Sequence, residues 1–246
     1  MTFLIAAAFA FLALHLLIAG TRVRDAIVSA IGERAYLGLF SLASVGGIIW
    51  LAMSYRAAMA SASNVQLFDL GYGIDNLAIP VVLVAFLLGV PGLLMPSPTS
   101  VGQASAAAKE ETVRGVLRIT RHPFLWGVAI WSAFHFCATG DYASTILFGT
   151  FLVLSLLGTL SIDAKRQRKL GDAWSRFAQR TSNVPFAAIA SGRNSFRARE
   201  YFDWRFLVAL ALFLAVLILH ARVIGVSPFP GGWTPPFWDG PSLTLS

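Results

Sequence analysis

The chain has 246 residues, of which 57% are hydrophobic and 13% charged, with a formal net charge of +7 and a mean hydropathy of +0.69. A water-soluble domain rarely reaches this hydrophobic share, so the composition indicates one polytopic membrane domain and excludes a separate soluble enzyme domain. The basic residues lie beside apolar segments, as in positive-inside loops, which argues against nucleic acid as a partner. The single cysteine, Cys137, excludes an internal disulfide and a cysteine-rich metal or iron–sulfur centre.

Apolar segments of transmembrane length follow one another along the chain. The first covers residues 2–19, and Arg22 and Arg24 come after it, which is the reverse of the charge order in a cleaved signal peptide. Further spans are expected at 36–54, 77–95, 121–137, 142–162 and 204–221. The sequence therefore predicts an all-α fold, a polytopic transmembrane bundle of about six helices.

The loops between these segments differ in charge. Residues 22–34, 109–121 and 163–203 are rich in Lys and Arg, whereas the loop 56–76 is not. The positive-inside rule then places the basic loops in the cytoplasm and both termini outside, which is the periplasm in a bacterium. Residues 109–118 are expected to form a short interfacial helix, and Trp174 and Phe177 to lay the third loop on the anionic leaflet.

Two units are expected along the chain. Residues 1–225 form the six-helix membrane domain, which includes the basic loop 163–203. Residues 226–246 form an external tail rich in Pro and Gly. The lipid bilayer is thus the first partner, while no internal repeat, phosphate-binding glycine loop or zinc motif is present.

All four histidines, His15, His122, His135 and His220, lie in or at the edges of apolar segments. An imidazole in hydrocarbon has a polar nitrogen that must be satisfied, so each is a functional-site hypothesis. The alternative is a hydrogen bond to a backbone carbonyl that merely packs helices. Their confinement to apolar segments favours the functional interpretation.

The chain is organised around residues 118–141, a hydrophobic helix with charge at its entry. Pro123 suits the first turn of a helix, where its missing N–H is not needed. Gly127, Trp131 and His135 recur at a spacing of four and share a face. His122 and His135 are about 20 Å apart along the axis and roughly 140° apart around it, so one small cofactor cannot take both as axial ligands.

Four segments together resemble the NnrU family, which includes the plant 15-cis-zeta-carotene isomerase as a distant relative. They are HLLIAGTRVRD, GERAYLGLFSLASVGGIIW, GVLRITRHPFLWGVAIWSAFHFCATGDYAS and HARVIGVSP. The resemblance implies a bacterial inner-membrane protein that works with nitrogen-oxide respiratory proteins in denitrification. Through the isomerase branch it also implies a b-type haem held by histidines.

The resemblance implies that His15 and His135 hold the iron. Helix spacing puts Gly127 and Trp131 on the His135 face, where the glycine leaves room for a flat macrocycle and the tryptophan borders it, and puts Ser132 three residues before His135. Depth gives a different partner, because His15 lies about 10 Å from the cytoplasmic charges, whereas His135 and His220 lie about 20 Å and 22 Å from them. His220 is therefore the alternative ligand. The isomerase resemblance expects a cysteine where Ser132 stands, so ligand exchange at the haem is not expected here.

A more remote resemblance is to membrane-embedded methyltransferases that bind S-adenosylmethionine. It rests on Arg121-His122-Pro123 and LGDAWSRF, and implies that Arg121 and His122 bind a cofactor carboxylate. The acidic pair of that family is missing, since only Asp163 precedes the basic loop. The second hypothesis is therefore a membrane enzyme that acts on a lipid-soluble substrate, as an isomerase or a methyltransferase, and the third is a cofactor-free assembly partner. The haem protein ranks first, and the sequence does not specify a reaction.

Overall fold

The computed structural model describes residues 1–71, 73–100, 103, 106–107 and 112–229. This part of the chain is helical, and its one β-bridge joins Gln66 and Asp141. The long elements are α1 (Thr2–Leu12), which continues as the π-helix η1 (Ala13–Ile18), α3 (Glu33–Met59), α4 (Ala78–Leu94), α5 (Pro123–Thr139), α6 (Tyr142–Leu170) and α10 (Trp204–Ile224). The shorter elements are α2 (Arg22–Ile31), η2 (Asp75–Leu77), η5 (Gly115–Arg118), α7 (Asp172–Gln179), α8 (Ala187–Ala190) and α9 (Ala198–Tyr201).

The predicted fold class is confirmed, and the chain is a multi-pass membrane protein by the length and composition of its helices. In the described ranges, 4 helices are long and apolar enough to cross a bilayer, or 5 if α1 with η1 and α2, bent by 78°, form one span. α5 has 17 residues, so it is shorter than the typical span of about 20. The predicted count of six is therefore approximate.

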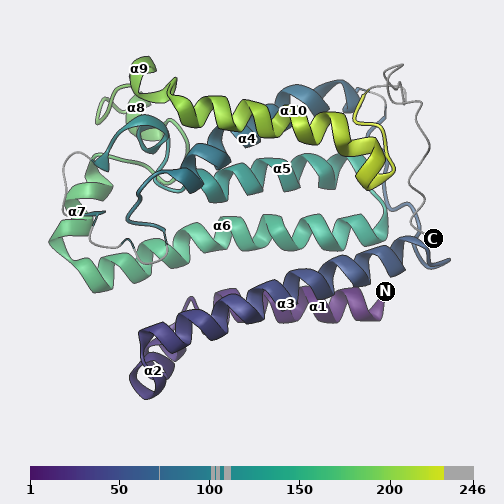
Figure 1. Cartoon of the computed structure of the whole chain (residues 1–246), viewed down its shortest axis with the longest axis horizontal. Coiled ribbons are helices and arrows are strands. Elements are labelled where there is room, and N and C mark those ends of the chain that lie inside the picture. The colour runs from purple at the N-terminus through teal and green to yellow at the C-terminus, as the bar shows by residue number, and fades with distance from the viewer. Residues whose placement is uncertain (72, 101–102, 104–105, 108–111, 230–246) are drawn as a thin grey trace.

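α5 occupies the centre of the bundle (Figure 1). It packs between α4 and α6, α10 packs on α4, and α1 and α3 pack on α6. The turn at Gly140, which has a left-handed backbone with φ of 63°, makes α5 and α6 antiparallel neighbours. The central position predicted for residues 118–141 is thus what the structure has.

Glycines set the closest helix contact. A Cβ atom at Gly127 would lie 2.7 Å from both the Ala85 carbonyl oxygen and the Gly89 Cα, and one at Gly92 would lie 2.6 Å from the Pro123 Cγ. Such small residues allow two membrane helices to approach closely. Gly127 therefore faces α4, where it contributes to packing.

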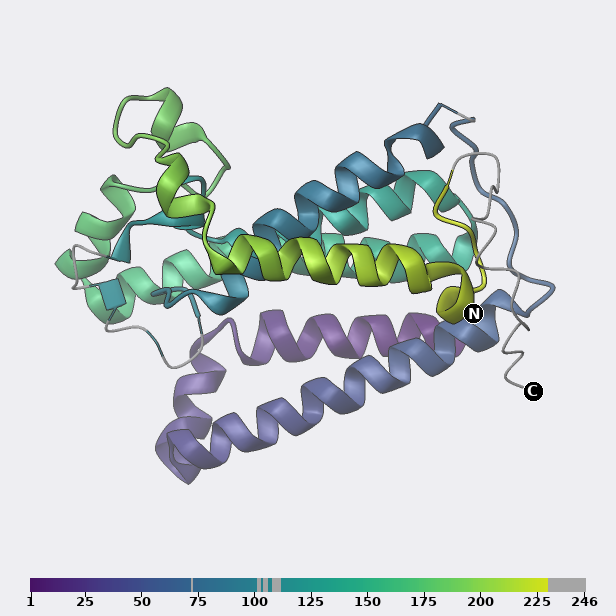
Figure 2. The same cartoon turned by 45° about the horizontal axis from the view of Figure 1, so that its top comes forward.

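The basic segments gather at one end of the bundle, which we call the basic end. It contains α2, α7, α8 and α9, while the N-terminus and the turn between α5 and α6 lie at the opposite end (Figures 1 and 2). The described parts of the three loops that the sequence predicts on one side of the membrane are thus on one side of the fold.

The structure differs from the sequence-based expectation in two places at the basic end. Trp174 and Phe177 are each only 3% exposed, because they pack inward against Ala107 and Val113. The prediction that they lay the loop on the leaflet was therefore wrong. The interfacial helix predicted at 109–118 is represented by the η5 turn, and residues 108–111 lie outside the described residues, as does most of the tail.

Reporter fusions test the orientation. Alkaline phosphatase fused within residues 163–203 should be inactive, because the positive-inside rule keeps that basic loop in the cytoplasm. The same reporter in the loop 60–74 should be active, since this loop lies at the opposite end of the bundle (Figure 1). Activity from the first fusion with none from the second would show that the topology is inverted.

Candidate functional site

A buried ionic cluster lies where α5 begins. The Arg121 Nε donates to both Asp163 carboxylate oxygens at 3.0 Å, and a second guanidinium nitrogen donates to Asp163 Oδ2. The His122 Nε2 lies 2.6 Å from Asp163 Oδ1. One carboxylate on α6 thus binds both polar residues of the Arg121-His122-Pro123 motif.

The backbone around this motif is held from several sides. The Arg121 N–H donates to the Ser182 carbonyl at 2.9 Å, and the Arg121 carbonyl accepts from the Thr99 hydroxyl at 2.9 Å. Pro123 then opens α5, with His122 as the residue before it. These bonds connect the start of α5 to both neighbouring loops, so the cluster also joins the basic end together.

The His122 side chain is fully buried. Its Nε2 must carry the proton, because it faces a carboxylate oxygen. Its Nδ1 is buried without a hydrogen-bond partner in the described part of the chain. A proton on an unpaired buried nitrogen would be costly, so Nδ1 holds a lone pair and the imidazole is neutral.

This geometry bears on the methyltransferase resemblance. That resemblance implies a ligand carboxylate on Arg121 and His122, but the carboxylate of Asp163 takes that place. The sequence did not identify Asp163 as their partner. The available signal was that Asp163 is the one acid at the entry to a strongly basic loop.

His135 lies on the face of α5 that turns toward α6. Its Nδ1 is 2.8 Å from the Trp131 carbonyl oxygen, and its ring centroid is 5.0 Å from that of Trp131 and 4.9 Å from that of Phe148. The Ser132 side chain points elsewhere, because its hydroxyl donates to the Val128 carbonyl at 2.7 Å and is buried. Aromatic rings therefore form the surroundings of His135.

His15 lies in the π-helix η1. Its Nδ1 is 2.9 Å from the Phe11 carbonyl oxygen and its Nε2 is 3.5 Å from the Ser44 hydroxyl. Its ring contacts Phe11 and Phe40, with centroid distances of 4.4 and 5.1 Å. π-Helical segments are rare and occur frequently at functional sites, so the local backbone supports a role for His15.

His220 lies near the end of α10, and its Nδ1 is 2.7 Å from the Val226 carbonyl oxygen. His135 and His220 lie near the C-terminal ends of α5 and α10, and both helices run from the basic end to the opposite end of the bundle (Figure 1).

The structure does not place His15 and His135 at the same depth in the bundle. Measured from the basic ends of their helices, His15 is three residues from Ile18 and His135 is twelve residues from Pro123, a difference in depth of about 13 Å. Their aromatic neighbours also differ. In the described ranges no group of three or more His, Cys, Asp or Glu side chains is placed to hold a metal ion.

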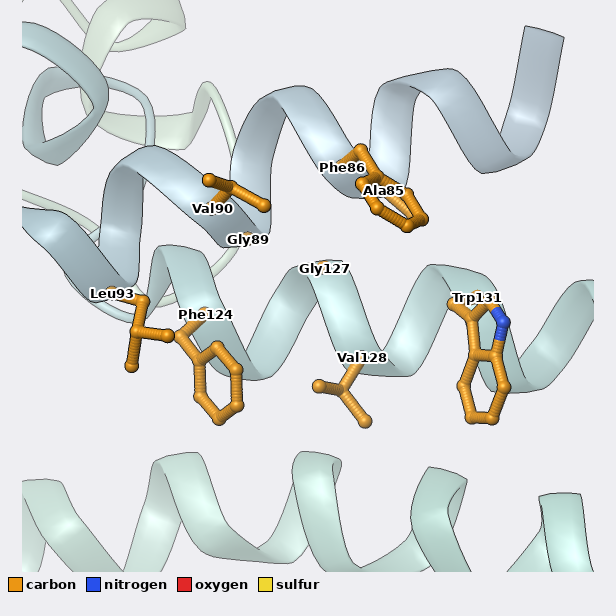
Figure 3. A pocket seen from close by; sticks show the side chains of 9 residues that line it. All are labelled: Ala85, Phe86, Gly89, Val90, Leu93, Phe124, Gly127, Val128 and Trp131. Atoms are coloured by element: carbon orange, nitrogen blue, oxygen red, sulfur yellow. The ribbon is translucent and has the colours of Figure 1, made fainter. Parts of the chain in front are cut away.

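An apolar pocket of about 360 Å³ lies between α4 and α5 (Figure 3). Trp131, Phe124 and Val128 border it from α5, and Phe86 and Leu93 from α4. Sequence spacing pointed to Gly127 and Trp131 of α5 but not to the pocket residues of α4. Neither segment alone shows that these two helices pack against each other.

A second ionic contact fixes the basic end. The Arg118 guanidinium donates to Glu200 Oε2 at 2.6 Å and to Oε1 at 3.0 Å, and the Gly115 N–H donates to the same carboxylate at 3.1 Å. These bonds join η5 to α9. The side-chain hydrogen bonds from Arg118 are the main reason that the pKa of Glu200 lies below its ordinary value.

The Glu200 contact should depend on pH. A carboxylate with a lowered pKa stabilises the fold at pH values above its unfolded pKa, and this contribution is lost as pH falls through the folded pKa. Glu200→Gln should therefore lower stability by about 1 kcal/mol at pH 7, because the group is partly exposed. Thermal unfolding in detergent should show a difference from the unsubstituted protein that shrinks below pH 4, and a difference constant down to pH 3 would contradict this assignment.

The chain is similar in sequence to two plant proteins. The chain is 26% identical over 213 residues to the chloroplastic 15-cis-zeta-carotene isomerase of Arabidopsis thaliana, which covers 83% of this chain and 56% of the relative. It is 29% identical over 109 residues to that of Zea mays, which covers 43% of this chain and 30% of the relative. The chain thus spans about half the length of the first relative and less of the second.

No solved structure matches this chain. The family model for NnrU protein matches residues 3–228, which is nearly the whole chain. The match includes every helix described above and all four histidines. The chain therefore belongs to the NnrU family.

Proposed function

We propose that the protein is a bacterial inner-membrane haem protein that holds b-type haem through intramembrane histidines and serves nitrogen-oxide metabolism. One observation carries the haem proposal. His15, His135 and His220 each have Nδ1 within hydrogen-bond distance of a backbone carbonyl oxygen, so Nδ1 carries the proton and Nε2 keeps the lone pair. A backbone carbonyl on the far nitrogen is the usual way in which a protein orients a metal-ligating histidine.

The donor set fits b-type haem in kind, because axial haem ligands include neutral imidazoles. The Nε2 atoms of His135 and His220 have no hydrogen-bond partner in the described ranges. Trp131 and Phe148 keep the His135 imidazole in apolar surroundings, which favours its neutral form. Bound haem would supply one-electron redox chemistry, while these residues would orient the ligand and exclude water.

His135 is the ligand that both lines of argument share. The family resemblance pairs it with His15, and the π-helix at His15 supports that choice. Depth in the bundle favours His220 instead, because His220 and His135 both lie near the ends of their helices that are far from the basic end. The two assignments predict different spectra for the His15→Ala and His220→Ala variants.

A membrane enzyme acting on a lipid-soluble substrate is the second candidate, and the apolar pocket between α4 and α5 favours it. The relatives named 15-cis-zeta-carotene isomerase add support. Against isomerisation by ligand exchange, Ser132 stands at the expected cysteine position, and its hydroxyl is bonded to the Val128 carbonyl.

An absorption spectrum of detergent-purified protein tests the haem proposal. The expected result is a Soret band with a sharp α band on reduction, in proportion to protein. A spectrum without haem bands, from protein that was expressed with haem available and is folded by circular dichroism, would overturn it. That result would favour the cofactor-free assembly role.

A further inference from the structure

Three basic side chains meet where α1 turns into α2 beside α6. Lys165 is half-buried, and its Nζ donates to the Ala19 carbonyl at 3.2 Å. Arg166 donates to the Ser100 carbonyl at 2.8 Å, and its Nε is buried without a hydrogen-bond partner in the described ranges. Arg24 lies close enough to both to repel them.

The two nearby acids neutralise Arg24 but form no salt bridge with Lys165 or Arg166. Asp25 and Glu33 both pair with Arg24, at 3.4 and 3.0 Å. No carboxylate lies within salt-bridge distance of Lys165 or Arg166 among the described residues. Two cations are therefore partly desolvated and bonded only to neutral carbonyls, which is costly unless an anion joins them.

The cluster lies where the apolar stretches of η1 and α6 end. The apolar stretch of α1 and η1 ends at Ile18, and the chain then bends by 78° into α2 at the basic end (Figure 2). Leu17, which is 59% exposed, and Leu160, which is 61% exposed, offer apolar surface on the membrane side of the cations. Basic residues directly beyond an apolar surface match the order of phosphate and acyl chain in a phospholipid.

We propose that Lys165 and Arg166, assisted by Arg24, bind the phosphate group of an anionic phospholipid in the leaflet at the basic end. The unpartnered Arg166 Nε and the Lys165 ammonium supply the donors, and the acyl chain lies along Leu17. This site is separate from the histidines and does not depend on haem.

Thermal unfolding of the full chain in detergent, titrated with phosphatidylglycerol, phosphatidylcholine or inorganic phosphate, tests the proposal. Phosphatidylglycerol should raise the melting temperature and the other two should not. Lys165→Gln with Arg166→Gln should weaken the apparent affinity for phosphatidylglycerol more than fivefold, since each basic residue near a membrane surface contributes about that factor. Arg168→Gln with Lys169→Gln is the matched control, because both side chains are exposed on the same helix.

An equal loss in both double variants would overturn the proposal in favour of general charge attraction. Stabilisation by inorganic phosphate alone would overturn the lipid assignment, and so would the absence of any shift with phosphatidylglycerol. If the first double variant does not fold, Lys165→Arg and Lys165→Gln replace it. The arginine variant should keep the phosphatidylglycerol shift and the glutamine variant should lose most of it, and equal shifts would refute the site.

Discussion

Asp163→Asn should destabilise the protein by about 3 kcal/mol, because it leaves buried charge without its counter-ion. The Arg121 and Asp163 side chains are only 14% and 18% exposed. Asparagine keeps the size of the side chain but cannot carry the charge that Arg121 faces. Its amide can also place an N–H against the His122 Nε2–H. Thermal unfolding followed by circular dichroism in detergent measures the loss.

The control is Asp172→Asn, which removes the same charge from an exposed acid at the start of α7. It should change stability by less than about 0.5 kcal/mol. Comparable melting temperatures for Asp163→Asn and the unsubstituted protein would contradict the role given to this carboxylate.

A double variant separates the cost of an unpaired charge from the cost of lost packing. Arg121→Met with Asp163→Leu removes both charges, so it should be less destabilising than the two single changes added together. Additive effects would mean that Arg121 and Asp163 act independently. The comparison therefore measures the coupling that the 3.0 Å contacts imply.

The fold class could be predicted because hydropathy acts over whole segments. An apolar run that is long enough, as a helix, to cross the hydrocarbon core of a bilayer leaves the chain few options besides a transmembrane helix. The ends were less predictable, since α3 begins at Glu33 and α6 continues to Leu170, both beyond the apolar runs. Polar residues outside the hydrocarbon continue a helix as readily as they begin a loop.

The residues of the candidate site stay predictions, but the structure shows how they are arranged. Sequence spacing placed Gly127, Trp131 and His135 on one face of a helix, whereas packing turns Gly127 toward α4 and His135 toward α6. The binding of Arg121 and His122 to Asp163 depends on how α5 and α6 pack, which the sequence leaves open. The prediction that Trp174 lies on the leaflet was wrong for the same reason, because an amphipathic pattern does not say whether lipid or protein covers the apolar face.

The histidines show this limit most clearly. His15, His135 and His220 could be identified from their apolar surroundings, and in these three the bond of Nδ1 to a carbonyl satisfies one nitrogen. The same bond is expected of a packing histidine and of a metal ligand. The two cases differ in whether Nε2 binds iron, which the spectra of the histidine variants detect.

His135→Ala should abolish low-spin haem, because His135 is the ligand on which the resemblance and the geometry agree. Removal of an axial imidazole opens a coordination position on the iron, so the remaining haem becomes high-spin or is lost. His122→Gln is the control, since glutamine can still donate to Asp163 and His122 lies at the basic edge. It should keep the spectrum.

The partner of His135 follows from two further variants. If the family assignment is right, His15→Ala loses the low-spin spectrum and His220→Ala keeps it. If depth decides, the results are reversed. Each variant is compared at equal protein concentration after circular dichroism has shown that its helices are intact.

The most direct test of the account is the electron paramagnetic resonance spectrum of oxidised His135→Ala beside that of the unsubstituted protein. A low-spin ferric signal is expected in the unsubstituted protein, and its absence is expected in the folded variant. An unchanged low-spin signal in His135→Ala would show that the iron is held elsewhere and would contradict the proposed site.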